Sequence, residues 1–448
     1  MGGQSRVPRD VPEAGTVSEQ TAADYIKEAE EKAVHVDDLP EDTRTREVHS
    51  VAVIGAGTMG GGIAMVFSNA GIPVTLIEQA QDGLDRGIAT IKGNYDRTAA
   101  KGRISEQDVA DRMERITPTL KLDDAADADL IIEAVFEDMD VKKDVFTRLD
   151  AIAKDGAILA TNTSRLDVDE IAAVTGRPQD VIGLHFFSPA NVMKLLEVVR
   201  GAQTAPDVIA TSMQLAPKVG KKPVLARICD GFIGNRMLTP YRREAEFLIE
   251  EGATPQQVDG VLKDFGLAMG PFAMSDLAGL DIGWAARKRQ APTRPEHLRY
   301  SSIGDQLCEA GRFGQKTGAG YYRYEKGDRT PIPDPEVQAI IEKASAEAGI
   351  ERREITDEEI IDRTMLALVN EGAKLLEQGI AQRASDIDVV YVNGYGFPAG
   401  KGGPMRWAEE RGLADVLATI ERLHEQHGEV WEPAPLLVRR VAEGATRF

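Results

Sequence analysis

A histidine and a glutamate twelve residues apart are the side chains best placed to do chemistry in this sequence. They are His185 and Glu197, which lie at the start and near the end of the stretch HFFSPANVMKLLEV. A histidine titrates near neutrality and can both take and return a proton if its tautomer is fixed. A buried carboxylate on a neighbouring strand can fix it. The pair is therefore a candidate general base with its orienting carboxylate. Two structural polar residues flanking a strand turn are the alternative.

The position of His185 along the chain favours the chemical interpretation. It follows an apolar run, VIGL, that is typical of a buried strand, whereas the other five histidines lie in polar tail, loop or helical surroundings. Open α/β sheets bind ligands beyond the carboxyl ends of their strands. A histidine at such a strand end is well placed to meet a substrate.

Two more polar segments fall in the same part of the chain. TNTS ends another apolar run and finishes with Ser164, and DGFIGNR opens a helical stretch and contains Asn235. Each segment also has a structural interpretation, because TNTS could be a helix N-cap and Asn235 could form a hydrogen bond between helices. Both segments are candidates for the same site.

A glycine motif near the start of the alternating region predicts a dinucleotide site. Gly55, Gly57 and Gly60 form GxGxxG between an apolar strand and a helix, and Glu78 ends the next strand twenty-three residues after Gly55. These glycines allow a tight turn, close approach of a pyrophosphate and close helix packing. A carboxylate at Glu78 would accept from the ribose hydroxyls and repel a 2′-phosphate, which favours NAD over NADP. FAD and a glycine turn without ligand are the alternatives.

Strand-like and helix-like segments alternate from residue 51 to about residue 186, and after Cys229 the pattern is almost wholly helical. The alternation predicts a mostly parallel sheet covered by helices on both faces, that is, an α/β Rossmann-type domain. The helical remainder partly repeats itself. NRMLTPYRREAEFLIEEG aligns with DRTMLALVNEGAKLLEQG, which places Arg236 over Arg363 and Gly252 over Gly379. The repeat predicts two tandem all-α modules.

These patterns divide the chain into five segments. The expected bounds are an N-terminal tail with a linker helix over 1–48, the NAD-binding Rossmann domain over 49–227, a first helical domain over 228–325, a linker over 326–354 and a second helical domain over 355–448.

Composition excludes several classes of function. A net charge of −20 argues against nucleic acid, whose binding requires Lys and Arg to neutralise phosphates. No apolar run is long enough for a membrane span, and the N-terminal stretch MGGQSRVPRDVPEAG lacks a signal-peptide core. Two cysteines, neither at metal-ligand spacing, favour a reducing cytoplasm and predict no metal site.

Taken together, the motifs resemble those of the L-3-hydroxyacyl-CoA dehydrogenase family. The resemblance runs from about Val51 to about Leu413 and rests on GAGTMG, IEAVFEDMDVKK, TNTS, HFFSPANVMKLLEV, DGFIGNR, MGPF and GQKTGAGYY, in the family's order. The second module and GYGFPAGKGGPM make the chain most similar to the dehydrogenase portion of multifunctional fatty-acid β-oxidation proteins. Those proteins carry an enoyl-CoA hydratase domain in front, which residues 1–48 are too short to hold, so hydratase activity is expected to be absent.

The resemblance implies roles for named residues. His185 matches the catalytic base and Glu197 its partner, while Ser164 and Asn235 match residues that contact the substrate. The matching cofactor residues are Gly55, Gly57, Thr58, Met59, Gly60, Glu78, Glu137, Lys142, Ser164, Ser188 and Lys316. Ser188 stands where many single-function members have Asn. The family's CoA-binding serine and lysine have no clear match, although residues 85–103 are basic.

The resemblance also implies an activity, the NAD-dependent oxidation of (S)-3-hydroxyacyl-CoA to 3-oxoacyl-CoA. The alternatives are a dehydrogenase of a non-CoA hydroxy acid and a non-catalytic NAD-binding scaffold. A separate hydratase or thiolase is a possible partner. In the second module Asp362 replaces Asn235, so that module is expected to be structural. The tandem pair favours a monomer with an internal pseudo-dimer, and a homodimer is the alternative.

Overall fold

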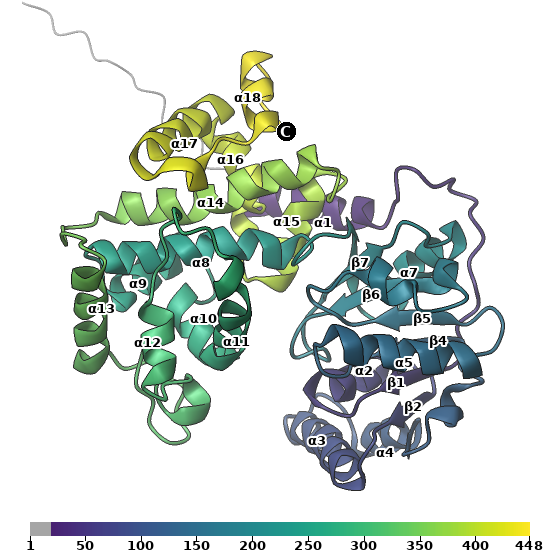
Figure 1. The fold of residues 1–448 in the computed structure, drawn as a ribbon. Coiled ribbons are helices and arrows are strands. Elements are labelled where there is room, and N and C mark those ends of the chain that lie inside the picture. Colours follow the sequence, from purple (N-terminus) through teal and green to yellow (C-terminus); the bar gives the residue numbers. More distant parts are fainter. Residues whose placement is uncertain (1–18) are drawn as a thin grey trace, which may run out of the picture.

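A computed structural model describes residues 19–448 and contains one eight-stranded sheet (Figure 1). Its strand order is β3-β2-β1-β4-β5-β6-β7-β8, and every neighbouring pair is parallel except β6 and β7. The strands are β1 (Val51–Ile54), β2 (Val74–Ile77), β3 (Ile116–Thr119), β4 (Leu130–Glu133), β5 (Ile158–Thr161), β6 (Val181–Phe186), β7 (Leu195–Arg200) and β8 (Lys222–Arg227). The expected Rossmann-type sheet is confirmed.

Helices cover both faces of this sheet, because its central strands are apolar on both sides and must be shielded from water. They are α2 (Thr58–Asn69), α3 (Gln81–Ala100), α4 (Glu106–Glu114), α5 (Met139–Ile152), α6 (Val168–Ala172) and α7 (Pro206–Lys218), with 3₁₀ turns η1 (Leu122–Ala125) and η2 (Pro178–Asp180). Two buried clusters lie on opposite faces, one containing Phe146 and Leu159, the other Phe67 and Leu76.

The residues that follow β8 are mainly helical and form the second lobe in Figure 1. The first set is α8 (Gly234–Glu251), α9 (Pro255–Phe265), α10 (Pro271–Ala278), α11 (Leu280–Gln290), α12 (Ile303–Glu309) and α13 (Pro335–Glu347), with η3 (Ala291–Thr293) and η4 (Gln315–Thr317). The second set is α14 (Asp357–Glu377), α15 (Ala384–Gly394), α16 (Pro404–Arg411), α17 (Leu413–His427) and α18 (Pro435–Ala442), with η5 (Ala399–Lys401) and η6 (Gly428–Trp431).

Helix α13 lies inside the segment expected to be a linker. Its Val337, Ile341 and Ala344 are buried and its neighbours are α8 and α12. These residues recur at the helical spacing that places them on one face. The linker was predicted from the stretch EKGDRTPIPDP, residues 325–335, which is rich in Pro, Gly and charge. The helix that follows this stretch packs with the first module.

The two long helices α8 and α14 pack against each other and are joined by reciprocal ion pairs. Arg236 contacts Glu371 at 2.7 Å, and Arg363, its counterpart in the repeat, contacts Glu244 at 2.9 Å. Each glutamate stands eight residues after the arginine of its own helix. The two copies of the repeat therefore share a pattern of ion pairs as well as a pattern of sequence. The modules pair in a pseudo-symmetric way.

The N-terminal helix α1 (Glu19–Ala33) completes the second module. Asp388 accepts hydrogen bonds from the first amides of α16, as Asp259 does from those of α10. Tyr322 OH donates to Asp259 at 2.8 Å in the first module, and Tyr25 OH of α1 donates to Asp388 at 2.7 Å in the second. The linker helix expected within residues 1–48 therefore supplies a side chain that the second module lacks.

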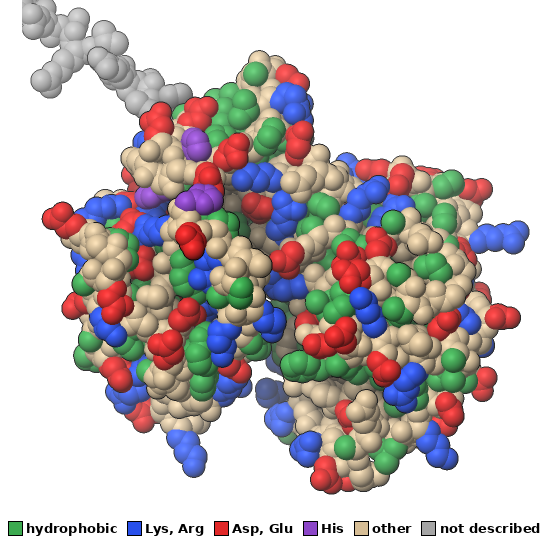
Figure 2. Space-filling view, in the orientation of Figure 1, with side chains coloured by type: hydrophobic (Ala, Val, Ile, Leu, Met, Phe, Trp, Pro, Cys, Tyr) green, Lys and Arg blue, Asp and Glu red, His purple; other side chains and the backbone are tan. Residues whose placement is uncertain are grey.

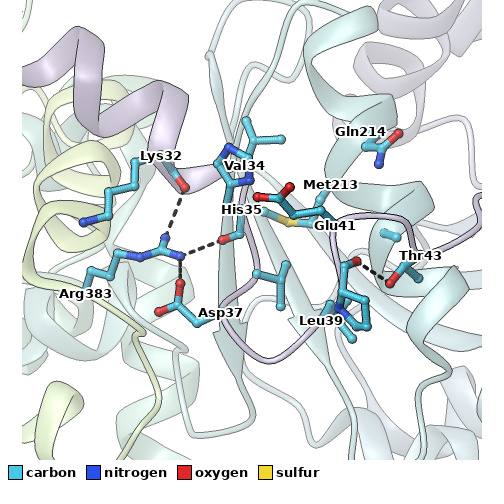
Figure 3. A pocket seen from close by; sticks show the side chains of 13 residues that line it. Lys32, Val34, His35, Asp37, Leu39, Glu41, Thr43, Met213, Gln214 and Arg383 are labelled. Carbon is cyan, nitrogen blue, oxygen red and sulfur yellow. Dashed lines mark hydrogen bonds and ion pairs between the residues drawn. The ribbon is translucent and has the colours of Figure 1, made fainter.

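A strap from residue 34 to residue 48 connects α1 to β1 and borders a cavity of about 400 Å³ (Figure 3). Arg383 fastens the strap by donating to the carbonyls of Lys32 and His35 and pairing with Asp37. None of the candidate site residues lines this cavity. The polar contacts of Arg383 beside the cavity hold the strap in place.

Candidate active site

The glycine turn between β1 and α2 leaves room for a ligand. Gly55 has a φ of +104°, and a Cβ on it would lie 2.7 Å from the Ala134 carbonyl oxygen. A Cβ on Gly60 would lie 1.8 Å from the carbonyl oxygen of Gly55. By contrast, nothing lies within 4 Å of a Cβ built on Gly57. Gly55 and Gly60 are thus needed for packing, whereas Gly57 faces open space.

The first turn of α2 offers amides to an anion at this point. The helix begins at Thr58, and its N-cap residue Gly57 provides no side-chain cap. Thr58 is exposed and Met59 half-buried. Uncapped amides at a helix N-terminus attract phosphate groups.

Glu78 lies next to this turn, in a cavity of about 360 Å³ that Gly55 and Gly57 also line. Its carboxylate accepts hydrogen bonds from the amides of Ala56 at 2.9 Å and Gln79 at 2.7 Å. The carboxylate is therefore held beside the glycine turn, where a ribose bound to the cavity would meet it. The cavity, the open Gly57 and the free amides fit a dinucleotide.

His185 and Glu197 lie opposite each other on the antiparallel strands β6 and β7. His185 Nδ1 is 2.7 Å from Glu197 Oε2, and the two residues are 5% and 0% exposed. A carboxylate only accepts, so Nδ1 carries the proton and Nε2 is the basic nitrogen. Nε2 has no hydrogen-bond partner among the described residues.

The second oxygen of Glu197 binds the helical lobe. Oε1 accepts from the amides of Ile233, at 3.2 Å, and Gly234, at 2.9 Å, where α8 begins. Glu197 therefore joins the histidine to the start of the helix that carries Asn235. The positive end of the α8 dipole also favours its negative charge.

Ser164 and Glu137 lie together beyond the ends of β5 and β4. Glu137 Oε2 accepts from the amide and hydroxyl of Ser164, at 3.0 and 3.2 Å, and Oε1 accepts from the Thr163 hydroxyl. Asn162 of the same loop accepts from the amide of Phe186, next to His185. The loop is thereby fixed beside the histidine.

The structure thus brings His185 and Glu197 together at the start of the helix that carries Asn235, with Ser164 and Glu137 on the loops after β5 and β4. Asn235 Oδ1 accepts from the hydroxyl of Tyr395 at 2.9 Å. Tyr395 directly follows α15 of the second module. Sequence reasoning missed it, because 160 residues separate it from Asn235 and only the tertiary fold joins them.

Three of the expected cofactor residues take no part in the contacts described above. Lys142 is 1% exposed and pairs with the buried Glu133 at 2.6 Å, so a contact with NAD would have to pass through this pair. Lys316 is exposed on η4 and pairs with Asp281. Ser188 is exposed and precedes Pro189 through a cis peptide bond.

Lys221 is a further residue that the sequence did not reveal. Its Nζ donates to the carbonyls of Ala190, at 2.5 Å, and Met193, at 2.6 Å, in the loop between His185 and Glu197. Burial lowers the pKa of the Lys221 ammonium to about 8. Lys221 therefore fixes the loop that joins β6, which carries His185, to β7, which carries Glu197.

Among residues 19–448 we find no helix that could span a bilayer. The described part of the chain also gathers no set of three or more His, Cys, Asp or Glu side chains that could hold a metal ion.

The sheet, its open glycine turn and the helical modules define a dinucleotide-binding protein of the dehydrogenase type. Residues 50–229 match the NAD-binding domain of 3-hydroxyacyl-CoA dehydrogenase, and residues 231–324 and 360–447 match the C-terminal domain of the same enzyme. The chain belongs to the 3-hydroxyacyl-CoA dehydrogenase family. This confirms the family, the NAD-binding domain and the two helical parts that the sequence predicted.

Solved structures support the same assignment. The chain is similar to 3-hydroxybutyryl-CoA dehydrogenase from Escherichia coli K12, with a TM-score of 0.78 and 29% identity over 89% of this chain and 99% of the other. The dehydrogenase part of multifunctional enzyme 1 from C. elegans is 29% identical with a TM-score of 0.69, over 95% and 98% of the two chains. (S)-3-hydroxybutyryl-CoA dehydrogenase from Ralstonia eutropha is 34% identical with a TM-score of 0.59, over 62% and 100%.

Curated relatives are longer than this chain. The peroxisomal bifunctional enzyme of Danio rerio is 47% identical over 90% of this chain and 58% of its own length. The fatty acid oxidation complex subunit alpha of Psychrobacter cryohalolentis is 35% identical over 90% and 56%. The chain thus spans a little over half of each. The cytoplasmic location expected from the sequence stays a prediction.

Proposed function

We propose that this chain catalyses the NAD-dependent oxidation of (S)-3-hydroxyacyl-CoA to 3-oxoacyl-CoA. The observation that carries the proposal is the buried His185–Glu197 pair on the neighbouring strands β6 and β7 of an NAD-binding sheet, with its carboxylate held by three donors. Such a pair gives a base with a fixed tautomer beside a hydride acceptor, which is what oxidation of an alcohol requires.

His185 Nε2 takes the proton from the 3-hydroxyl group and becomes positively charged. The Glu197 carboxylate stabilises that charge, because both groups are shielded from water and only 2.7 Å apart. Asn235 donates to the oxygen on C3 as it changes from hydroxyl to carbonyl, and Ser164 contacts the same oxygen when its hydroxyl turns from Glu137 toward the substrate. Bound NAD supplies the hydride acceptor.

The cofactor would lie along the glycine turn. Gly55, Gly57, Thr58, Met59 and Gly60 would line the site of its pyrophosphate, with amides from the first turn of α2 as donors, and Glu78 would accept from its adenosine ribose. On the nicotinamide side we propose contacts from Glu137, Ser164, Ser188, Lys142 and Lys316. Lys142 would act through Glu133, which it holds in place.

The acyl-CoA would enter the hollow between the sheet domain and the first helical module, which Figure 2 shows between the two lobes. Its phosphates carry negative charge, and α3 and the loop after it offer Arg86, Lys92, Arg97, Lys101 and Arg103. A relative is named as a subunit of a fatty acid oxidation complex. We therefore keep a separate hydratase or thiolase as a proposed partner.

Substitution His185→Ala tests the proposal. NADH oxidation with acetoacetyl-CoA should fall by about 10³-fold or more, whereas the Kd for NADH should stay unchanged, because the histidine is needed for proton transfer and not for cofactor binding. His297→Ala is the matched control, since it removes an exposed histidine that also pairs with a glutamate. Wild-type turnover in His185→Ala would refute the mechanism.

A further inference from the structure

We infer that Tyr395 of the second helical module is a positioning residue of the active site in the first. Its hydroxyl donates to Asn235 Oδ1 at 2.9 Å. Asn235 is the residue proposed to hold the oxygen on C3, so the inference rests on the proposed function. It gives the second module, which has Asp362 in place of its own Asn235, a part in catalysis that acts through Asn235 of the first module.

The ring of Tyr395 also reaches the histidine side of the site. It packs edge-on against Phe187, with ring centres 5.5 Å apart and planes at 77°. Phe187 in turn lies against His185, with ring centres 4.3 Å apart. Tyr395 of the second module therefore touches both Asn235 and Phe187, the aromatic neighbour of His185.

Tyr395 is itself held in place from two sides. Its ring stacks on Tyr391 at 4.8 Å, and the Tyr391 hydroxyl donates to the carbonyl of Gly234. Any side chain at Gly234 would collide with Tyr395, because a Cβ there would lie 2.4 Å from its hydroxyl oxygen. The Gly234 amide also donates to Glu197. The glycine is thus a common contact of the tyrosine pair and the catalytic carboxylate.

The hydrogen bond has a chemical consequence for Asn235. A carboxamide carries one oxygen, which accepts, and one NH₂ group, which donates. When the oxygen faces the Tyr395 hydroxyl, the NH₂ group is turned to the opposite side, where it can donate to the substrate oxygen. Without the tyrosine the amide could flip and present an acceptor to that oxygen. While its hydroxyl donates to Oδ1, Tyr395 therefore holds Asn235 with its NH₂ group toward the substrate.

Substitution Tyr395→Phe tests the inference because it removes the hydroxyl and keeps the ring. We expect kcat/KM with acetoacetyl-CoA and NADH to fall about tenfold, mainly through kcat, with the Kd for NADH unchanged. Tyr25→Phe is the matched control. It removes a tyrosine hydroxyl bonded to another residue of the same module, Asp388, and should leave kcat/KM unchanged.

A double-mutant cycle with Asn235→Ala separates positioning from general stability. In the Asn235→Ala background Tyr395→Phe should cause less than a twofold further loss, because the group that it positions is gone. The inference is overturned if Tyr395→Phe alone changes kcat/KM less than twofold, if Tyr25→Phe lowers it equally, or if the two losses are independent. An inactive His185→Ala together with any of these results would leave the proposed function standing.

Discussion

At the scale of single residues, Glu197 performs two tasks with two oxygens. One oxygen orients His185, and the other accepts two amides at the start of α8. A lone catalytic pair would need only the first contact. The second contact ties the geometry of the base to the position of the helical lobe that carries Asn235.

Substitution Glu197→Gln should therefore damage both tasks. Glutamine has one accepting oxygen, so it can serve His185 or the α8 amides but not both, and its NH₂ group then faces another donor. We expect kcat to fall by about 10²- to 10⁴-fold and the free energy of unfolding to fall by about 1 to 3 kcal/mol. Steady-state kinetics and urea unfolding measure the two effects.

The control for this substitution is Glu429→Gln, which alters the exposed pair with His297. It should change neither quantity by more than experimental error. NADH affinity should be nearly unchanged in Glu197→Gln. A Glu197→Gln enzyme with normal kcat would show that the carboxylate charge is not needed.

At the scale of elements, the pairing of α8 with α14 holds the two modules together. The reciprocal contacts are alike in sequence and differ in burial: Arg363 is fully buried, whereas the Arg236 side chain is 20% exposed. Arg363 also pairs with Glu251 at 2.6 Å. Removing Arg363 takes a fully buried cation away from two buried carboxylates, Glu244 and Glu251, which costs more than removing the partly exposed Arg236.

We therefore expect unequal effects from equivalent substitutions. Arg363→Met should lower the free energy of unfolding by about 3 to 5 kcal/mol, and Arg236→Met by about 1 to 2 kcal/mol. Urea unfolding of both variants provides the measurement, and each serves as the control for the other. Equal losses, or a larger loss for Arg236→Met, would contradict the role assigned to burial.

At the scale of the whole molecule, the junction between the helical modules should open in acid. Burial alone would raise the pKa of Glu251, but its hydrogen bonds and the charges of Arg363 and Arg299 outweigh burial and lower that pKa to about 2. A carboxyl whose pKa is lowered on folding stabilises the fold above its unfolded pKa of about 4.5. That stabilisation is lost as the pH falls toward 2.

Acid unfolding of the wild type and Glu251→Gln measures this effect. The wild type should be the more stable protein at neutral pH, and the difference should shrink by on the order of 3 kcal/mol between pH 5 and pH 2. Glu425→Gln, an exposed change on α17, is the control and should show no such trend. A difference that stays constant over this range would contradict the assignment.

The internal pairing also bears on the oligomeric state. The apolar faces of α8 and α14 already cover each other within one chain, so that surface is not available to a second copy. We expect a monomer at micromolar concentration, with light scattering giving the mass of one chain. A dimer would indicate that another surface mediates assembly.

The sequence by itself determined the parts whose signals are local. Gly55, Gly57 and Gly60 stand between a strand and a helix, and this context predicted a dinucleotide site; the family match confirms an NAD-binding domain. The alternation of strands and helices predicted the sheet, because burial on two faces requires apolar strands. The spacing of Arg236 and Arg363 within their repeats predicted the tandem modules.

Only the tertiary structure decided which distant residues meet. Tyr395 reaches Asn235 across 160 positions, and Tyr25 reaches Asp388 across 363. Neither tyrosine carries a local pattern, because a hydrogen bond between helices depends on how they dock and not on sequence spacing. For the same reason the sequence could not reveal that Lys142 lies closed off beside Glu133, or that Glu197 binds the start of α8.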